Sequence, residues 1–217
     1  MKKMLKIAAA VAVLGLSTGA RADLVVDLFN VGQNQIIDSV LGGGGVWSTE
    51  AGPSSTIIGG YRDLYVEKLS NASTTKVVKA DVSDGFLNYS SDTLTTGKGI
   101  VRWDGQGTTT SATPLMGLGG LNLSVFNSFE LLTMFSDNGF SFNIELYTDA
   151  THWSRISLIS SSHDAGGVEP GISSYIPLWG FTDCTNAIPA YTTTCGADGA
   201  VDLTNVNAIQ AVIDPFG

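Results

Sequence analysis

Short runs of β-type residues, separated by glycine, aspartate, asparagine and serine, recur along almost the whole chain. The run that begins at Phe140 alternates apolar and polar residues as far as Tyr147, which is typical of a strand with one buried face. Helical periodicity is weak, and only residues 203–209 are compatible with a single helical turn. Short strands with turn signals at regular spacing favour a sandwich or barrel, and we expect an all-β protein with one jelly-roll-like β-sandwich. The expected strands are residues 23–30, 64–70, 74–82, 86–91, 100–103, 129–135, 140–148, 153–159, 175–181 and 207–213.

The turn residues predict how neighbouring strands are joined. Asp84-Gly85 predicts a tight hairpin, because both residues tolerate the positive φ angles that such turns need. The segment 136–139, Ser-Asp-Asn-Gly, predicts a second hairpin. Residues 59–63 read as a turn, residues 41–45 as a glycine-rich linker followed by polar sequence to Ser55, and residues 105–120 and 160–171 as long surface loops.

The N-terminus has the pattern of an export signal. Three lysines, Lys2, Lys3 and Lys6, precede an apolar run at residues 7–16, and Ala20 and Ala22 fit a signal-peptidase site. We therefore expect a cleaved signal peptide at residues 1–22 and one β-sandwich domain at residues 23–217. The apolar run is too short to remain as a membrane anchor, and no stretch of the remaining chain predicts a transmembrane helix.

Composition narrows the partners and the redox compartment. Only 14% of residues are charged and the net charge is −9, so a nucleic acid partner is not expected, because phosphate binding needs a basic face. Hydrophobic residues make up 43% of the chain, which argues against disorder. The two cysteines, Cys184 and Cys195, are too few for a four-cysteine zinc site, and in an oxidising compartment we expect them to form a disulfide.

No catalytic constellation stands out, and we expect a protein that is not an enzyme. Asp104 and Glu145 are candidates for the carboxylate pair of a glycosidase, but we interpret them as a turn aspartate and a solvated glutamate. His152 and His163 are eleven residues apart and lack the spacing of a metalloprotease pair, and no Gly-x-Ser-x-Gly motif frames a nucleophile.

We expect no cofactor, with a structural calcium ion as the alternative. Exported β-sandwiches rich in aspartate offer loop oxygens of the kind that Ca²⁺ prefers. The oxygens to consider are those of Asp137, Asn138, Asp149 and Asp164, although no segment matches an EF-hand loop and no ligand set can be assigned.

Aromatic residues provide the candidate ligand site. Sugar rings stack on exposed aromatic faces while polar side chains around them fix orientation. Tyr147, Trp153 and Arg155 lie on or next to neighbouring strands, so we predict that they share a face and bind a ligand there. The four tryptophans are Trp47, Trp103, Trp153 and Trp179, and we expect at least two of them to fill the core. Arg62 and Asp63 are interpreted as a structural arginine–carboxylate pair at a hairpin.

Several segments, taken in order, resemble the secreted proteins of the PEP-CTERM/exosortase sorting system of Gram-negative bacteria. They are Gly-Gly-Tyr-Arg-Asp-Leu at 59–64, Gly-Ile-Val-Arg-Trp-Asp-Gly at 99–105, Gly-Leu-Gly-Gly at 117–120, residues 136–149 and residues 206–214. The resemblance implies an exported β-sandwich, at the cell surface or secreted, that is associated with extracellular polysaccharide. The Pro-Glu-Pro motif, apolar helix and basic cluster of the sorting signal are not found before Gly217. Either the sequence stops short of that signal or the protein is released without sorting.

These observations predict three functions in order of preference. The first is a non-catalytic extracellular protein that binds glycan in an exopolysaccharide matrix. The second is a structural or adhesive surface protein that self-associates through exposed strand edges. The third is a glycan-active hydrolase. The sequence does not indicate the oligomeric state.

Overall fold

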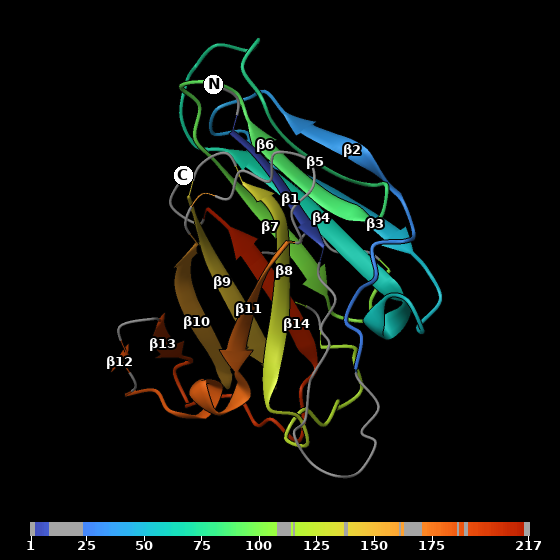
Figure 1. The fold of residues 1–217 in the computed structure, drawn as a ribbon, viewed down its shortest axis with the longest axis vertical. Helices are drawn as coiled ribbons and strands as arrows, with labels where there is room; N and C mark the ends of the chain where they lie inside the picture. Colours follow the sequence, from blue (N-terminus) through green and yellow to red (C-terminus); the bar gives the residue numbers. More distant parts are fainter. Residues whose placement is uncertain are drawn as a thin grey trace.

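Two antiparallel sheets make up the protein in the computed structural model. The structure describes residues 24–107, 114, 116–136, 139–160, 162, 171–185 and 191–214, together with the backbone of residues 3–8 and 187–188. Figure 1 shows the sheets stacked on each other, with β8 and β11 crossing in front of β9 and β14.

The six-stranded sheet has the order β11–β8–β1–β6–β5–β2 and the eight-stranded sheet has the order β12–β13–β10–β9–β14–β7–β4–β3. The strands of the first are β1 (Lys3–Ala8), β2 (Gln33–Asp38), β5 (Val78–Ser83), β6 (Phe86–Ser91), β8 (Ser128–Ser136) and β11 (Ile172–Pro177). Those of the second are β3 (Val46–Ala51), β4 (Tyr61–Lys68), β7 (Gly97–Trp103), β9 (Phe140–Tyr147), β10 (Trp153–Ser160), β12 (Ala187–Ile188), β13 (Tyr191–Cys195) and β14 (Ala208–Ile213). Two 3₁₀ turns, η1 (Ile58–Gly60) and η2 (Leu178–Thr182), complete the regular structure of the described residues.

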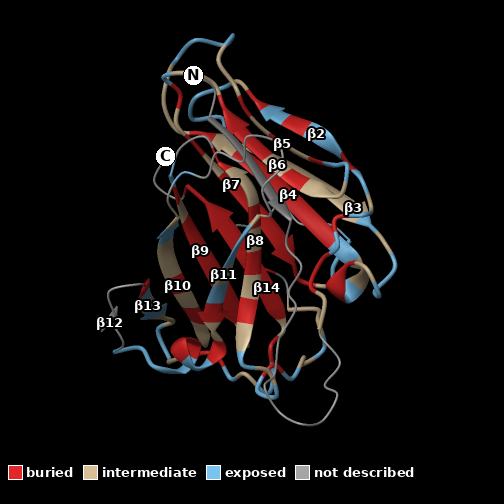
Figure 2. Ribbon diagram, in the orientation of Figure 1, coloured by how far each residue is buried: buried red, intermediate tan, exposed pale blue. Residues whose placement is uncertain are grey.

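The core lies between the sheets, and the predicted all-β sandwich is confirmed. Alternate residues of each central strand point inward, as Val101, Leu146 and Ile156 do from the eight-stranded sheet and Leu131 from the six-stranded sheet. Figure 2 shows mostly buried residues, in red, along β4, β9 and β14, with exposed residues in the loops and on β2 and β11. At about 25 cal/mol per Å² of apolar surface, this shared core is the main stabilising contribution to the fold.

The hairpin predicted at Asp84-Gly85 is confirmed. Both residues have positive φ, 56° for Asp84 and 80° for Gly85, and Ser83 of β5 pairs directly with Phe86 of β6. Two consecutive positive φ angles give the turn a twist that matches the twist of the strands.

The second predicted hairpin, at residues 136–139, is wrong. β8 pairs with β1 and β11 in the six-stranded sheet, whereas β9 pairs with β10 and β14 in the eight-stranded sheet. The two strands that flank this segment therefore lie in different sheets, and a local turn signal does not tell whether the strands on either side of it pair with each other. Residues 137 and 138 lie outside the described residues.

Other boundaries also differ from the predictions. Of the predicted strand at residues 23–30, the described residues 24–30 do not form a strand: Asp27 makes one isolated bridge to Ile57, and Phe29 has φ 52° because its amide bonds back to the Asp27 carboxylate. The predicted turn at residues 59–63 ends at Gly60, and β4 already begins at Tyr61. The predicted strand at residues 175–181 continues as η2 beyond Pro177. β14 confirms the predicted strand at residues 207–213, and the helical turn considered at residues 203–209 is not formed. The polar strands β2 and β3 were missed, as were β12 and β13.

The N-terminal segment takes part in the fold of the full-length chain. β1 lies at the centre of the six-stranded sheet, between β6 and β8. β1 falls within the predicted signal peptide, residues 1–22. Cleavage of the chain after residue 22 therefore stays a prediction. No helix in the described ranges is long and apolar enough to cross a membrane.

Candidate functional site

The outer face of the eight-stranded sheet, the side turned away from the six-stranded sheet, carries an unusual line of polar residues. Because side chains alternate along each strand, the residues between the core positions all point to this face. Strand register then aligns one such residue from each of seven neighbouring strands. From β3 to β13, this polar row consists of Thr49, Asp63, Arg102, Gln210, Glu145, Arg155 and Thr194.

Hydrogen bonds link the middle of the polar row into one network. Arg102 Nε donates to Gln210 Oε1 at 2.7 Å, and Gln210 Nε2 donates to Glu145 Oε2 at 2.8 Å. Arg155 Nε donates to Glu145 Oε1 at 2.6 Å, and the Tyr147 hydroxyl donates to Glu145 Oε2 at 2.5 Å. Each donor therefore has a fixed acceptor, and the side chains are held in place before any ligand arrives.

The structure brings the three predicted ligand residues together. Trp153 of β10 is the direct cross-strand partner of Tyr147 of β9, with ring centroids 6.0 Å apart at an angle of 32°. The Arg155 guanidinium lies 5.3 Å from the centre of the Trp153 ring and is ion-paired with Glu145. Tyr147 is buried, whereas Trp153 and Arg155 are partly exposed. Burial raises the pKa of Tyr147, so its hydroxyl remains a donor to Glu145.

Exposure increases from the middle of this face toward β13. Arg102 and Gln210 are buried, Arg155 is about one-third exposed, and Thr192 and Thr194 of β13 are exposed. The accessible part therefore combines an aromatic ring, a guanidinium and hydroxyl groups. We call the residues Trp153, Arg155, Ser157, Thr192 and Thr194 the aromatic platform.

The predicted disulfide is confirmed and supports one edge of the aromatic platform. Cys184 and Cys195 are bonded, with Cα atoms 5.5 Å apart, and no free cysteine occurs among the described residues. Cys195 is the last residue of β13 and pairs with Ser154 of β10. The bond thus ties the end of β13, the strand that carries Thr192 and Thr194, to the segment that follows η2.

The other tryptophans have different surroundings. Trp103 is in the core, 4% exposed, and its Nε1 donates to Asp27. Trp47 of β3 packs against Tyr65, with ring centroids 4.5 Å apart. The Arg102 guanidinium lies 4.7 Å from the centre of the Trp47 ring, so Trp47 packs on the polar row near its β3 end. Trp179 on η2 is 57% exposed and lies outside the polar row.

One carboxylate oxygen of Asp63 lacks a hydrogen-bond partner. Oδ1 accepts a hydrogen bond from Thr49, while the buried Oδ2 accepts none. Burial, with a smaller contribution from the negative charge of the nearby Asp104, raises the pKa of Asp63 to about 6. Asp63 therefore holds a proton in mildly acidic solution, where an exposed aspartate is ionised.

The interpretation of Glu145 as a solvated residue is wrong. Glu145 is 2% exposed, and its two oxygens are occupied by Tyr147, Gln210 and Arg155. Asp104 does accept a turn bond from the Gln106 amide, but it is only 1% exposed. The sequence alternation predicted the correct face of the strand for Glu145. That polar face is buried at this position, however, and not solvated as we expected.

Arg62 belongs to the core side of β4, opposite to Asp63. The expected arginine–carboxylate pair exists, but its acid is Asp27: Arg62 Nη1 lies 3.0 Å from Asp27 Oδ2, and both side chains are fully buried. Arg62 Nε also donates to Gln33, and the guanidinium lies over the Phe29 ring. The pair fastens the N-terminal loop to the sandwich. Arg62 and Asp63 do not pair with each other, because neighbouring residues of a strand point to opposite faces of the sheet.

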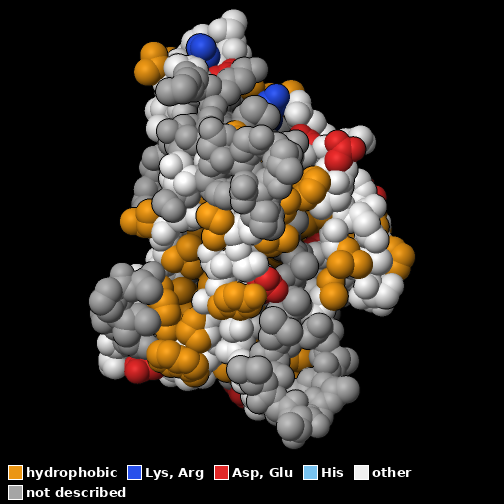
Figure 3. Space-filling view, viewed as in Figure 1, with side chains coloured by type: hydrophobic (Ala, Val, Ile, Leu, Met, Phe, Trp, Pro, Cys, Tyr) orange, Lys and Arg blue, Asp and Glu red, His pale blue; other side chains and the backbone are white. Residues whose placement is uncertain are grey.

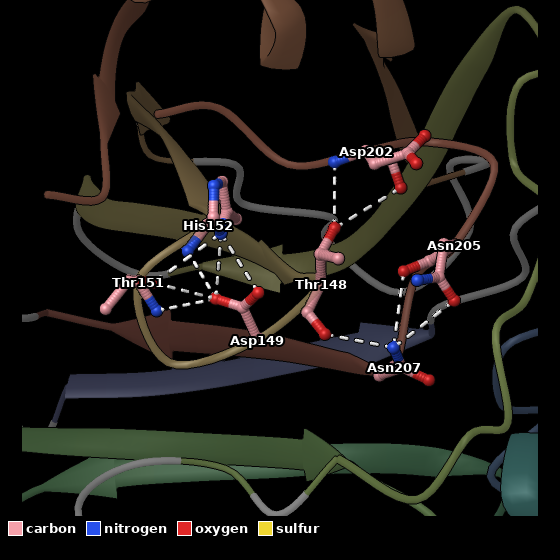
Figure 4. A network of polar contacts seen from close by, with 7 residues as sticks. All are labelled: Thr148, Asp149, Thr151, His152, Asp202, Asn205 and Asn207. Atoms are coloured by element: carbon pink, nitrogen blue, oxygen red, sulfur yellow. Dashed lines mark hydrogen bonds and ion pairs between the residues drawn. The ribbon is translucent and has the colours of Figure 1, made fainter. Parts of the chain in front are cut away.

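Of the four candidate calcium residues, only Asp149 lies among the described residues. Asp149 caps the turn between β9 and β10, accepting bonds from the amides of Thr151 and His152 and from His152 Nδ1 (Figure 4). These bonds lower the pKa of Asp149 below its usual range. The same loop cluster joins Thr148 to the Asp202 amide and Asn207 to the Thr148 carbonyl. Asp137, Asn138, His163 and Asp164 lie outside the described residues. Within the described part of the chain, no three acidic, histidine or cysteine residues are grouped to hold a metal ion.

Comparison of the chain with known protein families, with curated proteins and with solved structures found no match. The functional argument therefore depends on the residues themselves.

Proposed function

We propose that the protein is an exported, non-catalytic glycan-binding protein whose ligand lies on the aromatic platform. The resemblance of several segments to secreted PEP-CTERM proteins supports, as part of this proposal, an exopolysaccharide matrix outside a Gram-negative cell as its location. The observation that carries the proposal is the partly exposed Trp153 ring with Arg155 locked beside it by Glu145.

The arrangement suits a sugar for physical reasons. A sugar ring offers an apolar face for stacking and hydroxyl groups around its rim, and the aromatic platform offers an indole face surrounded by donors and acceptors. The Arg155 charge is already paired with Glu145, and so it is not free to pair with an acidic sugar. An uncharged glycan therefore fits better than a strongly anionic one.

Substitution of Trp153 tests the proposal. The purified full-length protein is measured against a panel of immobilised microbial and plant polysaccharides, and the best ligand is then titrated calorimetrically. Trp153→Ala is expected to weaken binding about tenfold or more, as for an aromatic residue at the centre of an interface. Trp179→Ala removes an exposed tryptophan elsewhere and is expected to leave the affinity unchanged.

Two outcomes would contradict this proposal. One is the absence of binding across the whole panel. The other is an equal loss of affinity in Trp153→Ala and Trp179→Ala when both variants keep the unfolding midpoint of the parent.

A second candidate function, self-association, is favoured by one surface. Hydrophobic side chains gather over β11 and η2 on the face seen in Figure 3, where Ile172, Tyr175 and Trp179 are 45%, 53% and 57% exposed. β11 is also the edge of its sheet, so its outer backbone groups are available for pairing. Light scattering against concentration tests this function: association should be lost in Tyr175→Lys, and a parent that stays monomeric at all concentrations refutes it.

A further inference from the structure

The outer face of the six-stranded sheet, the side turned away from the core, carries a hollow at β2, β5 and β6. These three strands are neighbours in the sheet, and β2 is its edge (Figure 1). The hollow has a volume of about 190 Å³ and continues into a more open depression beside residues 32–35 and 81–83. We call its polar residues on this face the Asp81 hollow, and they are Gln35, Lys79, Asp81, Ser83, Asn88 and Ser90.

A bulge in β2 explains why Gln35 points into the hollow. The register shifts between Gln33 and Ile36, because β2 has one residue more than β5 there. Residues two apart in a regular strand point to the same face, whereas the bulge separates Gln33 from Gln35. Gln33 is 5% exposed and hydrogen-bonded in the core, while Gln35 is exposed and bonds to Asp81 on the outer face. Bulges that re-aim a side chain in this way are frequent next to active sites.

The Asp81 carboxylate organises the floor of the hollow. Asp81 of β5 lies directly opposite Asn88 of β6. Its Oδ1 accepts a hydrogen bond from Gln35 Nε2 at 3.2 Å, and its Oδ2 accepts bonds from Ser83 Oγ at 2.8 Å and Asn88 Nδ2 at 3.0 Å. One donor from each of the three strands therefore holds the carboxylate in place before any ligand arrives.

The same side chains keep hydrogen-bonding groups for a ligand. Within the described part of the chain, no group donates to the amide oxygens of Gln35 and Asn88, and none accepts from the Lys79 ammonium. These groups supply acceptors and donors side by side. The hollow holds one acid, Asp81, and one base, Lys79, so its formal charge is zero. A single carboxylate beside a lysine is a poor site for Ca²⁺, which takes about six to eight oxygen ligands.

We propose that the Asp81 hollow is a second sugar-binding site, which takes one residue of an uncharged glycan. A sugar hydroxyl donates and accepts at once, as a Ser or Thr hydroxyl does, and so matches a neutral hollow lined by both kinds of group. The hollow has room for several water molecules, and the hydroxyls of one sugar ring replace them at the same partners. Hydrogen bonds exchanged with water give a modest net free energy, so we expect millimolar affinity for a single sugar.

The position of the hollow gives the second site a purpose. The aromatic platform lies on the outer face of the other sheet, so the two sites face away from each other across the sandwich. The sheets alone are about 10 Å apart, and a short glycan segment does not reach both outer faces. If the proposed function holds, on which this step alone rests, the protein bridges two glycan chains of the matrix.

Binding at the hollow is tested in full-length Trp153→Ala, which lacks the main contact of the aromatic platform. Methyl glucoside, methyl galactoside and methyl mannoside are titrated separately and followed by two-dimensional ¹⁵N NMR. At least one of them should shift the signals of β2, β5 and β6 in a saturable way. Addition of Asp81→Ala should weaken this binding about tenfold or more, because a charged acceptor is lost and its three donors are released.

Two further variants, also made in Trp153→Ala, keep the test decisive. Gln35→Ala removes an exposed side chain of an edge strand, so it should fold normally and weaken binding severalfold even if Asp81→Ala does not fold. Glu130→Ala is the matched control and should leave the affinity unchanged. Glu130 lies on the same outer face and accepts bonds from Ser173 and Tyr175, but it belongs to β8 and lies outside the hollow.

Three results would overturn the second site. They are the absence of binding by all three glycosides in Trp153→Ala, saturable shifts confined to strands other than β2, β5 and β6, and losses in Asp81→Ala and Gln35→Ala no larger than in Glu130→Ala. If binding is absent only at the aromatic platform, the proposed function fails and the hollow remains. If it is absent only at the hollow, this inference fails and the proposed function remains.

Bridging is measured by light scattering of the parent mixed with dextran, galactan or mannan, with the parent alone as the baseline. The parent should form large assemblies with at least one polymer. Trp153→Ala and Asp81→Ala should each still bind that polymer and form none. A parent that binds sugar at both sites and forms no assemblies refutes the bridging role.

Discussion

Replacement of Asp63 by asparagine should stabilise the protein at neutral pH and have little effect in acid. The folded protein raises the pKa of Asp63 from its usual value of 3.8 to about 6, so the native state binds a proton more tightly than the unfolded chain does. The stability that this proton contributes is fully present below about pH 4 and is lost as the pH rises through 6. A difference of about two pH units corresponds to about 3 kcal/mol between these limits.

Asparagine removes the charge and keeps the shape of the side chain. Its amide oxygen still accepts the bond from Thr49, and its amide group adds donors beside the Asp104 carboxylate, where Asp63 Oδ2 has no partner. Urea unfolding of the parent and of Asp63→Asn is measured from pH 4 to pH 8. The free energy of unfolding of Asp63→Asn, relative to that of the parent, should increase by up to about 3 kcal/mol as the pH rises across this range.

Asp149 provides a matched control with the opposite sign. Hydrogen bonds from the turn amides hold its folded pKa below the usual range, so its contribution is present above about pH 4 and is lost as the pH falls. Asp149→Asn should therefore be destabilising at neutral pH and less so in acid. If the two difference curves have the same slope, or if Asp63→Asn is uniformly destabilising, the reasoning about the buried carboxyl is refuted.

Further substitutions test how the fold is held together. Removing the disulfide in the double variant Cys184→Ser, Cys195→Ser should lower the free energy of unfolding by about 3 kcal/mol, measured in urea, because the short closed loop no longer restricts the unfolded chain. Asp27→Ala should cost about 3–5 kcal/mol, seen as a lower thermal midpoint, since it leaves the Arg62 charge buried without its partner. Leu146→Ala, at a fully buried position, should cost about 2–5 kcal/mol by the same measurement.

Local patterns in the sequence predicted the local structure well. The alternation from Phe140 to Tyr147 identified both the strand and its core face, and Asp84-Gly85 identified a hairpin with the correct register. Both signals depend on residues within about ten positions of each other. The disulfide was predicted on a different ground, because the chain has only two cysteines and an oxidising compartment was expected.

Predictions failed where distant segments decide the outcome. The turn signal at residues 136–139 does not tell whether the flanking strands pair with each other, and only the partners of β8 and β9 show that they lie in different sheets. β3 was not predicted because its sequence does not alternate apolar and polar residues. In the structure every residue from Val46 to Glu50 is partly buried, so the strand has no clear core face. Its pairing with β4 and the stacking of Trp47 on Tyr65 give it a place in the sheet, and neither contact is visible in the local sequence.

The polar row explains why the candidate site was only partly predictable. The proximity of Tyr147, Trp153 and Arg155 follows from one tight connection between β9 and β10. Their link to Arg102 and Gln210 needs β7 and β14, which are about a hundred residues apart in sequence and adjacent in the sheet. A slip of one residue in any of these strands would turn its polar residue toward the core. Buried charges without partners cost several kcal/mol, so the network penalises every register except the observed one. The residues that we propose to support a sugar therefore also fix the pairing of the strands that carry them, and a single substitution in the row is expected to alter both.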